Sequence, residues 1–495
     1  MSVQRTYNSQ DTYVGPLGEG WSLNYDMRLT SLATKVVEMK VEDGRRDRYI
    51  SSDGEEFVPP PGVNATFVRN DDSYTLTRED QTKYNFDDDG YLTSIVTSND
   101  LTTTLTYSGT LLTNVTEPAG RTITFTWSVS NTRIAGVEDP LGRTVVYAYT
   151  DGELTSVADL RGNVSTYAYT GTNGLLSSLI EPGRSTPTFL NEYDAQGRVT
   201  SQWLGGEDAP MVFSYDPDNR RTTVTDARGK EQVHTYSIQL PLTDREDSYG
   251  NSLHMTYNAN NDLTSVSDEL GRKTGYFYDT RGNVTSIVDA LDNEQTMVYD
   301  DRNNLTAVTD ARGVPTTYEY DEYDNLTAII QTVGVEPITT TFTYYEDGAL
   351  AGLLQSRTDP LGHTTSHRYD SYGNMTVITD ALGTVTTYGY DLAGRRTFET
   401  VTKDSQPHTI YYTYDDADNL TTITQTVDSE VVTTSYEYDE TGNRFSMTDA
   451  NGVVTKYEYD GLKRLVKMVQ NYREGLPKDA QTNVETTYEL SLIHI

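Results

Sequence analysis

Two histidines four residues apart, His363 and His367, are the most obvious candidates for chemistry in this sequence. On a helix, this spacing would turn both imidazoles toward one metal ion. The residues around them, however, predict a turn followed by a strand, and no third ligand is in view. The chain also has no cysteine, which excludes thiolate metal sites, disulfides and a cysteine nucleophile. We therefore predict neither a metal centre nor a cofactor.

Carboxylates are abundant, with 74 Asp and Glu residues in the chain, and pairs of them could act as general acid and base or bind Ca²⁺. Nearly all of them, however, fall at positions that recur along the sequence. An active site needs one unusual arrangement, whereas a recurring aspartate is typical of a residue that caps a turn. We predict that these aspartates are structural and that the chain is not an enzyme, and Ca²⁺ binding between acidic turns stays an open alternative.

The elements that carry these side chains are repeats, marked by an aromatic residue every 20 to 25 positions from Phe86 to Tyr459. Ten of the tyrosines among them, and also Phe86, are followed directly by Asp, and Gly, Asn or Asp often stands four residues beyond the aromatic. These three residue types tolerate a positive φ better than others, so the spacing predicts a tight turn. The predicted structural positions of the motif are Tyr193, Asp194, Gly197, Tyr278, Asp279, Gly282, Tyr299, Asp300, Tyr320, Asp321, Tyr369, Asp370, Gly373, Tyr390, Asp391, Gly394, Tyr414, Asp415, Tyr438, Asp439, Gly442, Tyr459 and Asp460.

A second turn is predicted eleven residues beyond the aromatic, where tetrads such as Asp310 to Gly313 recur. The strand before the motif alternates, as in Thr317 to Tyr320, whereas the strand after it, as in Leu305 to Val308, breaks the alternation and is predicted to be bulged. No segment between turns is long enough for a helix, so each repeat is predicted to be one β-hairpin. In three units with a spacing of 24, a longer loop is predicted at the second turn, at residues 331–338, 402–408 and 425–432.

A single hairpin is marginally stable in water, so the repeats must pair edge to edge into one continuous sheet. Strand twist accumulates along such a sheet and coils it. The predicted fold class is all-β, with tandem β-hairpin repeats coiling into a spiral β-sheet shell, or partial cocoon. Packing between neighbouring hairpins explains the tyrosine-rich faces more simply than stacking on sugars, which stays the alternative.

Composition limits the function further. The net charge of -36 repels phosphate backbones, so no nucleic-acid partner is expected. No stretch approaches the roughly 18 apolar residues that span a bilayer, so no membrane span is expected. The absence of cysteine fits export from a bacterium, although the residues after Met1 do not form an apolar signal segment. We expect either another export route or a natural protein that begins earlier.

The repeated patterns YDxxGN(L/V)T and DxxGxxTxYxYD resemble the Rhs and YD-repeat proteins, which include bacterial wall-associated toxins, insecticidal toxin-complex shells and the teneurins with their YD shell. The resemblance covers residues 86 to about 470. Arg5 to Ser9, Gly15 to Trp21 and Tyr25-Asp26 resemble the module that precedes the repeats in bacterial members. The predicted division is residues 1–30 for this module, 31–85 for strand-rich lead-in repeats, 86–470 for the array, and 471–495 for a degenerate or truncated end.

The resemblance implies a hollow cocoon that sequesters a variable C-terminal toxin. A self-cleavage motif of the form DPxGL, in a conserved core segment, normally ends such an array, and the expected partner is this missing core and toxin. The tetrads Asp139 to Gly142 and Asp359 to Gly362 look similar, but we interpret them as second turns, because proline suits the second position of a turn. The predicted function is a structural shell of a secreted or cell-surface bacterial protein. The alternative is an adhesin that binds glycans or cell-wall polymers.

Overall fold

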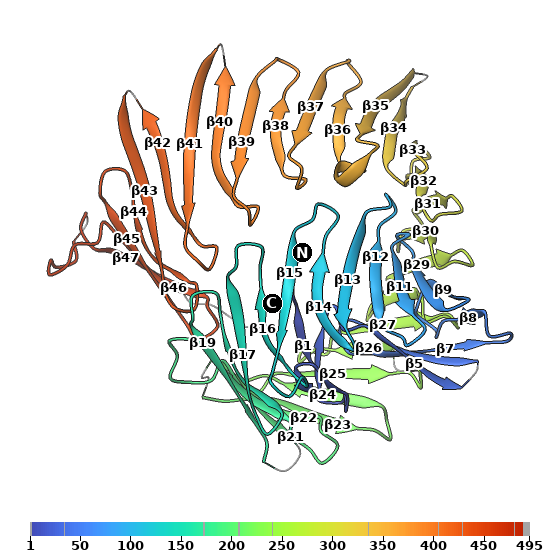
Figure 1. Ribbon diagram of the computed structural model, residues 1–495. Coiled ribbons are helices and arrows are strands. Elements are labelled where there is room, and N and C mark those ends of the chain that lie inside the picture. Colours follow the sequence, from blue (N-terminus) through green and yellow to red (C-terminus); the bar gives the residue numbers. More distant parts are fainter. Residues whose placement is uncertain are drawn as a thin grey trace. The chain divides into compact units, whose positions relative to one another are not determined.

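The computed structural model confirms the all-β prediction, with 56% of residues in strands and 1% in helix (Figure 1). It describes residues 2–488 apart from 34, 172–173, 206–207, 240, 335, 404, 428 and 480. Residues 489–495, in the predicted degenerate end, lie outside this range. Within the described range, no helix has the length and apolar character needed to cross a bilayer.

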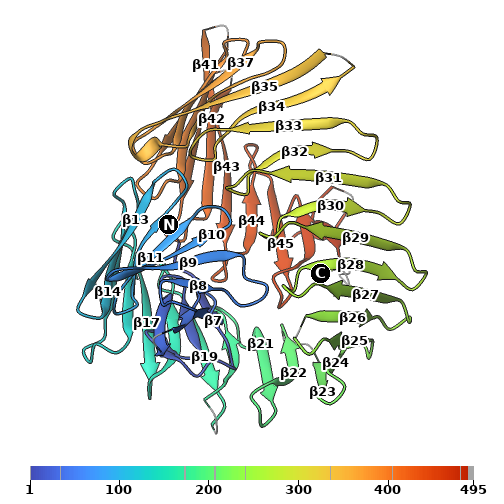
Figure 2. The same cartoon turned by 90° about the vertical axis from the view of Figure 1, so that its right-hand side faces the viewer.

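One antiparallel sheet of 43 strands runs in chain order from β5 (Arg28–Ala33) to β47 (Val484–Thr487). Within each unit, consecutive strands of the sheet pair with one another in chain order, as the ladder of β26 to β33 in Figure 2 shows. β5 pairs with β6 and β47 pairs with β46, and among the described residues no ladder joins these two ends, so the sheet is open. The continuous sheet of tandem hairpins is therefore confirmed.

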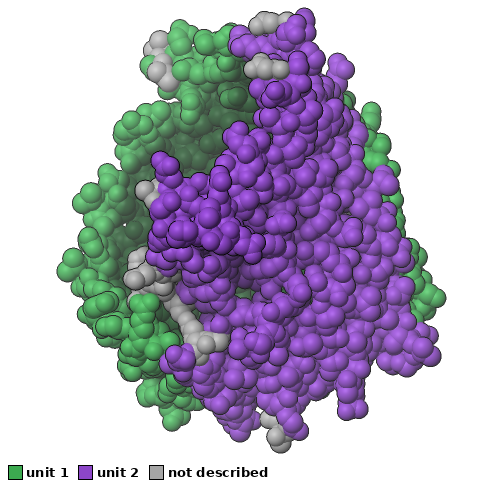
Figure 3. Space-filling model, turned by 90° about the vertical axis from the view of Figure 1, so that its left-hand side faces the viewer, with its two compact units in different colours: residues 1–122, 211–367, 371–373 green, residues 123–210, 368–370, 374–495 purple. Residues whose placement is uncertain are grey.

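The chain forms two compact units, and each combines stretches that are distant in sequence (Figure 3). Unit 1 contains residues 1–122, 211–367 and 371–373. Its elements, two of which continue into unit 2, are β1 (Arg5–Tyr7), β2 (Val14–Gly15), β3 (Gly18–Glu19), β4 (Trp21–Leu23), β5, β6 (Val36–Lys40), β7 (Arg46–Ser51), β8 (Glu56–Val58), β9 (Ala65–Asn70), β10 (Ser73–Arg78), β11 (Lys83–Asp87), β12 (Leu92–Val96), β13 (Thr102–Ser108), β14 (Leu111–Thr116), the first residue of β15 (Thr122–Trp127), β23 (Met211–Asp216), β24 (Arg221–Thr225), β25 (Glu231–Tyr236), β26 (Leu242–Glu246), β27 (Ser252–Tyr257), β28 (Leu263–Asp268), β29 (Lys273–Tyr278), β30 (Val284–Val288), β31 (Glu294–Tyr299), β32 (Leu305–Thr309), β33 (Pro315–Tyr320), β34 (Leu326–Val333), β35 (Glu336–Tyr344), the 3₁₀ helix η1 (Gly348–Leu350), β36 (Leu354–Thr358) and most of β37 (Thr364–Tyr369).

Unit 2 contains residues 123–210, 368–370 and 374–495. Its strands are most of β15, β16 (Ile134–Glu138), β17 (Thr144–Thr150), β18 (Glu153–Ala158), β19 (Val164–Tyr169), β20 (Leu176–Ile180), β21 (Phe189–Tyr193), β22 (Val199–Leu204), β38 (Met375–Thr379), β39 (Val385–Tyr390), β40 (Arg396–Lys403), β41 (Gln406–Tyr414), β42 (Leu420–Val427), β43 (Glu430–Tyr438), β44 (Arg444–Thr448), β45 (Val454–Tyr459), β46 (Leu465–Gln470) and β47.

The predicted bulge lies directly after the Tyr-Asp turn. Tyr299 pairs with Leu305, but Val298 pairs with Ala307, so Thr306 is the extra residue of the bulge. The Thr306 hydroxyl donates a hydrogen bond of 3.1 Å to the Val298 carbonyl. This contact explains why threonine recurs at the position, because the side chain satisfies a carbonyl beside the interrupted ladder.

The prediction of longer loops in the three 24-residue units is wrong. The extra residues lengthen the strands instead, so that β34 pairs with β35 as far as Val333 and Glu336. The pairs β40 with β41 and β42 with β43 are extended in the same way. The segments include β-branched residues on the strands, such as Thr332, Thr426 and Val431, and these residues favour continued pairing over an open loop.

Fully buried apolar side chains gather at the beginning of the sheet. Phe67 packs against Tyr49, Phe57 and Tyr74 with ring centroids 5.0, 5.2 and 5.7 Å apart. Beyond Leu176, the buried apolar side chains among the described residues are Ala328 and Val469. Most of the array is therefore a single layer with half-buried faces, and the backbone ladder and the corners must supply much of its order.

The N-terminal segment packs against the first hairpins of unit 1. Asp11 forms an ion pair of 3.0 Å with Arg46 on β7, and Asp26 forms one of 2.7 Å with Lys40 on β6. The Lys40 ammonium also lies 3.9 Å from the centre of the Tyr13 ring. These contacts tie the segment to the start of the sheet.

Candidate functional site

The repeated Tyr-Asp corner is the side-chain arrangement that recurs through the array. At Asp391, one carboxylate oxygen accepts the backbone N–H groups of Ala393 and Arg395, each at 3.0 Å. The other oxygen accepts the Arg395 Nε–H at 2.7 Å. Gly394 has a φ of 80°, a left-handed conformation that an L side chain adopts at a cost. One aspartate therefore fixes the whole turn.

The other predicted motif aspartates are in the same arrangement, with Asn or Arg as the side-chain donor. Asn283, for example, donates its backbone N–H and its amide N–H to the two oxygens of Asp279, both at 2.9 Å. The residues that donate to the predicted motif aspartates are Arg198 to Asp194, Asn283 to Asp279, Asn304 to Asp300, Asn325 to Asp321, Asn374 to Asp370, Arg395 to Asp391, Asn419 to Asp415, Asn443 to Asp439 and Arg464 to Asp460.

Positive φ angles occur at the predicted glycine positions Gly197, Gly282, Gly373, Gly394 and Gly442. Asn303, Asp324 and Asp418 adopt the same conformation at that position in their repeats. In the repeat of Tyr215, by contrast, the positive φ lies at Arg220 rather than at Asn219, and β23 and β24 pair without a bulge.

Most of the motif tyrosines connect their repeat to the one before it. The Tyr320 hydroxyl donates to the Leu305 carbonyl at 3.0 Å, and Tyr278 donates to Leu263 at 2.7 Å. Leu305 begins the strand after the Tyr299-Asp300 turn, and Leu263 begins the strand after the corresponding Tyr257-Asn258 turn. The same bond joins Tyr193 to Leu176, Tyr390 to Met375, Tyr414 to Arg396, Tyr438 to Leu420 and Tyr459 to Arg444.

The electrostatics of the corner keep the tyrosines neutral and the aspartates charged. Burial raises the pKa of Tyr299, Tyr320 and Tyr459. Burial also works against the charged form of Asp391, but hydrogen bonds and the charge of Arg395 outweigh it, so the pKa of Asp391 is lowered. A phenol donor and a carboxylate acceptor are the states that the hydrogen bonds need.

The second turn repeats the aspartate device. Asp139 accepts the backbone N–H groups of Leu141 and Arg143 at 2.9 and 3.0 Å, so the Asp139 to Gly142 tetrad forms the turn that we predicted. Asp359 caps its tetrad in the same way, and its second oxygen lies 2.9 Å from Nδ1 of His363. His367 lies on β37, and burial lowers its pKa. In the described part of the chain, no three potential metal ligands form a group.

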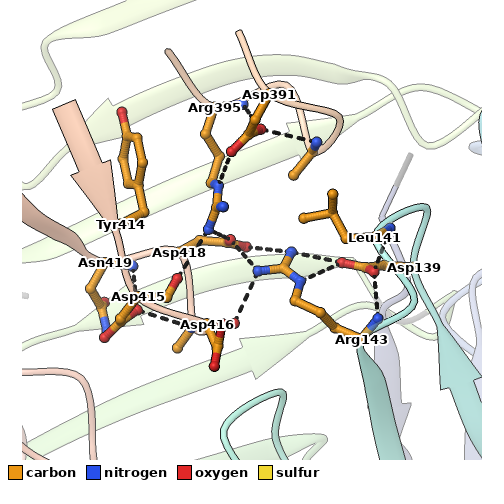
Figure 4. A network of polar contacts seen from close by, with 12 residues as sticks. Asp139, Leu141, Arg143, Asp391, Arg395, Tyr414, Asp415, Asp416, Asp418 and Asn419 are labelled. Carbon is orange, nitrogen blue, oxygen red and sulfur yellow. Dashed lines mark hydrogen bonds and ion pairs between the residues drawn. The ribbon is translucent and has the colours of Figure 1, made fainter. Parts of the chain in front are cut away.

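In unit 2, corners from two distant stretches meet along a line that we call the unit-2 seam (Figure 4). Arg143, which lies beside its own turn aspartate Asp139 at 2.6 Å, also forms an ion pair of 2.6 Å with Asp418. Asp418 is shared with Arg395, whose Nη1 lies 2.8 Å away. Further contacts along this seam are Arg161 to Asp415 at 3.4 Å, Lys463 to Glu181 at 2.8 Å, and Arg184 to the Gly461 carbonyl.

Unit 1 has a comparable line of corner contacts, the unit-1 seam, between residues 62–121 and 261–372. The Asn325 amide donates to the Asn99 side-chain oxygen at 2.9 Å, and the Gln81 amide donates to the Arg302 carbonyl at 3.0 Å. A Cβ at Gly352 would meet the Asn99 side chain and displace it, and the φ of 78° also favours glycine at this close approach. The sequence patterns did not predict either seam.

A groove of about 830 Å³ lies beside the unit-1 seam. On one side it is lined by Asn99 and Asp100, and on the other by aromatic and acidic residues that include Tyr323, Tyr345 and Asp347. The second side combines the Tyr320-Asp321 corner with the one repeat in which Tyr replaces the motif aspartate and η1 lengthens the corner. Tyr344-Tyr345 in place of Tyr-Asp is therefore the sequence signal that could have located this groove.

Antiparallel hairpins in tandem, each closed by aspartate-capped corners, define a β-hairpin repeat protein. The RHS Repeat family model matches residues 193–231, 257–294, 299–336, 350–385, 369–406 and 438–472. A second model, described as a domain of unknown function, DUF6531, matches residues 1–49. The chain belongs to the Rhs family of YD-repeat proteins, as its motifs indicated.

The chain spans about a tenth of the length of the curated relatives that it matches. The tRNA(Glu)-specific nuclease WapA of Bacillus subtilis subsp. natto (strain BEST195) is 30% identical over 239 residues, which are 48% of this chain and 10% of that protein. The tRNA nuclease WapA of Bacillus subtilis (strain 168) is similar to the same extent.

Among solved structures, the chain is similar to the Photorhabdus luminescens Tc holotoxin pore, with 11% identity and a TM-score of 0.46 over 97% of this chain and 31% of that chain. It is also similar to the TcdB2-TccC3-Cdc42 complex, with 11% identity and a TM-score of 0.44 over 95% of this chain and 31% of that chain.

Proposed function

We propose that this chain is the structural shell of a secreted or cell-surface bacterial Rhs-type toxin protein. In this proposal, the array encloses or presents a C-terminal toxin domain that lies outside residues 1–495. The chain itself has no catalytic role, and the partner of the array is the core and toxin region of its own protein. Competition between neighbouring cells is the setting in which such a protein acts.

The observation that carries this proposal is the continuity of the wall. The ladder runs through 43 strands, and in each compact unit the corners of distant stretches lock together. A continuous single-layer sheet of this kind can separate an interior from the solvent without a large hydrophobic core of its own. Family membership agrees with the role, since the curated relatives carry the name of a nuclease while this chain aligns with only a tenth of their length.

The experiment compares the full-length gene product with a version that lacks residues 86–470. Both are treated with trypsin under native conditions, and the region beyond residue 495 is followed by mass spectrometry. We expect this region to survive in the full-length protein and to be digested without the array, because an enclosing wall excludes the protease. Equal digestion in both proteins would contradict the shell.

A second candidate function is glycan binding, and the groove beside the unit-1 seam favours it. Aromatic rings such as those of Tyr323 and Tyr345, next to the amide of Asn325, suit the apolar faces and hydroxyl groups of a sugar. The volume of about 830 Å³ is that of a typical ligand site.

A glycan and cell-wall polymer array with the intact chain tests this candidate. Specific binding that is lost in Tyr323→Ala, but kept in Tyr249→Ala at an exposed corner outside the groove, would support an adhesin. No binding on the array would leave the shell as the function of the chain.

A further inference from the structure

The contacts that cross the two seams differ in chemistry. Across the unit-2 seam, guanidinium and ammonium groups meet carboxylates in three ion pairs, Arg143 with Asp418, Arg161 with Asp415, and Lys463 with Glu181. Across the unit-1 seam, two hydrogen bonds join amide groups to an amide oxygen and a carbonyl, at Asn325 with Asn99 and at Gln81 with Arg302. The cation Arg121 at this seam lies 5.6 Å from the centre of the neutral Tyr372 ring across it. The two seams therefore respond differently to ionic strength.

The ion pairs of the unit-2 seam are only partly shielded from solvent. The side chains of Arg143 and Asp418 are 15% and 46% exposed, and those of Lys463 and Glu181 are 40% and 19% exposed. Molar salt weakens charge pairs that solvent can reach, and it weakens the more buried of them less. Hydrogen bonds between neutral amides do not depend on screening in this way.

We infer that the unit-2 seam is an electrostatic clasp, which releases the corners of two distant stretches of the sheet as ionic strength rises. The backbone ladder within each stretch stays intact, because its hydrogen bonds lie within the strands and not across the seam. The unit-1 seam stays closed under the same conditions. This inference rests on the contacts within each unit and holds whether or not the array encloses a toxin.

Hydrogen exchange of the intact chain, followed by mass spectrometry at about 0.01 M and about 1 M NaCl, tests the clasp directly. We expect exchange at the corners 139–143, 159–163 and 415–418 to be faster at high salt. The rise should be on the order of two- to fivefold for each ion pair that is lost. The unit-1 corners near Asn99 and Asn325 should not change. Salt also screens the general repulsion within a chain of charge -36, and this effect acts on both seams. Exchange at the unit-1 corners therefore serves as the internal reference.

A charge-neutralising variant separates the clasp from other effects of salt. Asp418→Asn keeps the turn, since asparagine tolerates the φ of 65° found at this position, but it removes the ion pairs to Arg143 and Arg395. At low salt, we expect faster exchange at residues 139–143 in this variant, together with a smaller response to salt. Glu181→Gln should do the same at residues 461–463.

The matched control is Asp324→Asn. Asp324 occupies the same motif position with a φ of 67°, and its ion pair of 2.7 Å with Arg302 stays within one stretch of the sheet. Exchange at the unit-1 seam should therefore not change. The clasp is overturned if high salt and both unit-2 variants leave exchange at 139–143 and 461–463 unchanged, or if the unit-1 corners open to the same degree. Amide protection within the strands shows that each variant is folded.

Discussion

At the scale of single residues, the tyrosine and the aspartate of the motif have separate tasks. Asp321 holds its own corner by accepting the backbone N–H groups of Tyr323 and Asn325, each at 2.9 Å. The Tyr320 hydroxyl donates a hydrogen bond to the Leu305 carbonyl of the previous repeat. Phenylalanine would fill the same space but could not make this bond, which gives a physical reason for 38 tyrosines against 10 phenylalanines.

Tyr320→Phe should therefore weaken the joint between two repeats. Removal of the hydroxyl leaves the Leu305 carbonyl without this donor, at an expected cost of about 1 kcal/mol. Native-state hydrogen exchange of β32 and β33 measures the local free energy of opening. Tyr318→Phe is the control, because Tyr318 lies on the same face of β33 and its hydroxyl makes no hydrogen bond within the described residues. Equal effects of both substitutions would show that the hydroxyl bond contributes nothing.

At the scale of the hairpin, the corner and the bulge set the register of neighbouring strands. The aspartate and the positive φ close the turn, and the extra threonine then shifts the pairing by one residue. Such a shift decides which face of the sheet the following side chains occupy, since a change of one residue moves a side chain to the other face. Corner and bulge therefore act together.

Gly442→Ala tests the corner. The position has a φ of 84° and open space around it, so a methyl group meets no atom and the cost comes from the backbone alone, at about 1–2 kcal/mol. Gly275→Ala is the matched substitution within a strand, where an added Cβ makes only ordinary contact at 3.8 Å. It should be neutral or stabilising, because alanine restricts the unfolded chain. Urea unfolding compares the two variants, and destabilisation of the same size in both would contradict the role of the left-handed turn.

Thr306→Val tests the bulge. Valine keeps the shape of threonine but loses the 3.1 Å bond to the Val298 carbonyl, so we expect a loss of about 1 kcal/mol in local stability. Thr317→Val on β33 lacks such a bond within the described residues and should cost less. Hydrogen-exchange rates of the amides in β31 and β32 are compared between the two variants. Identical rates would show that the Thr306 hydroxyl does not stabilise the bulge.

At the scale of the whole molecule, the repetition of the aspartate device makes stability depend on pH. Hydrogen bonds from Asn293 and from backbone N–H groups lower the pKa of Asp289, and the pKa of Asp247, Asp310 and Asp380 is also lowered. A carboxyl whose pKa is lower in the folded state stabilises the fold above its unfolded value of 3.8, and this contribution is lost as the pH falls through the folded value. Acid therefore weakens many corners together.

We expect the melting temperature to change little between about pH 7 and pH 5 and to fall steeply below about pH 4. Circular dichroism of the strands during heating measures this dependence. Asp289→Asn keeps a side-chain acceptor but cannot titrate, so exchange at its own corner should depend less on pH in the acid range than at the unaltered corner of Asp268. A melting temperature that is equal at about pH 5 and pH 3 would contradict the proposed origin of the stability.

The sequence by itself determined the hairpin, both turns, the bulge and the continuous sheet. These features depend on contacts within one repeat or between neighbours, and the spacing of Tyr320, Asp321 and Thr306 along the chain encodes them directly. The prediction from sequence was wrong at the second turns of the 24-residue units. The extra residues, such as 402–408, could lengthen either a loop or a strand, and cross-strand pairing favoured the strand.

Only the tertiary structure decided which corners meet. Arg143 and Arg272 both lie four residues after the first aspartate of a second-turn tetrad and both pair with that aspartate, yet Arg143 also reaches Asp418, 275 positions away. Such contacts depend on the twist added by every strand between the two corners, so small local angles accumulate into a long-range position. Ion pairs across the unit-2 seam and amides across the unit-1 seam are therefore properties of the folded ribbon.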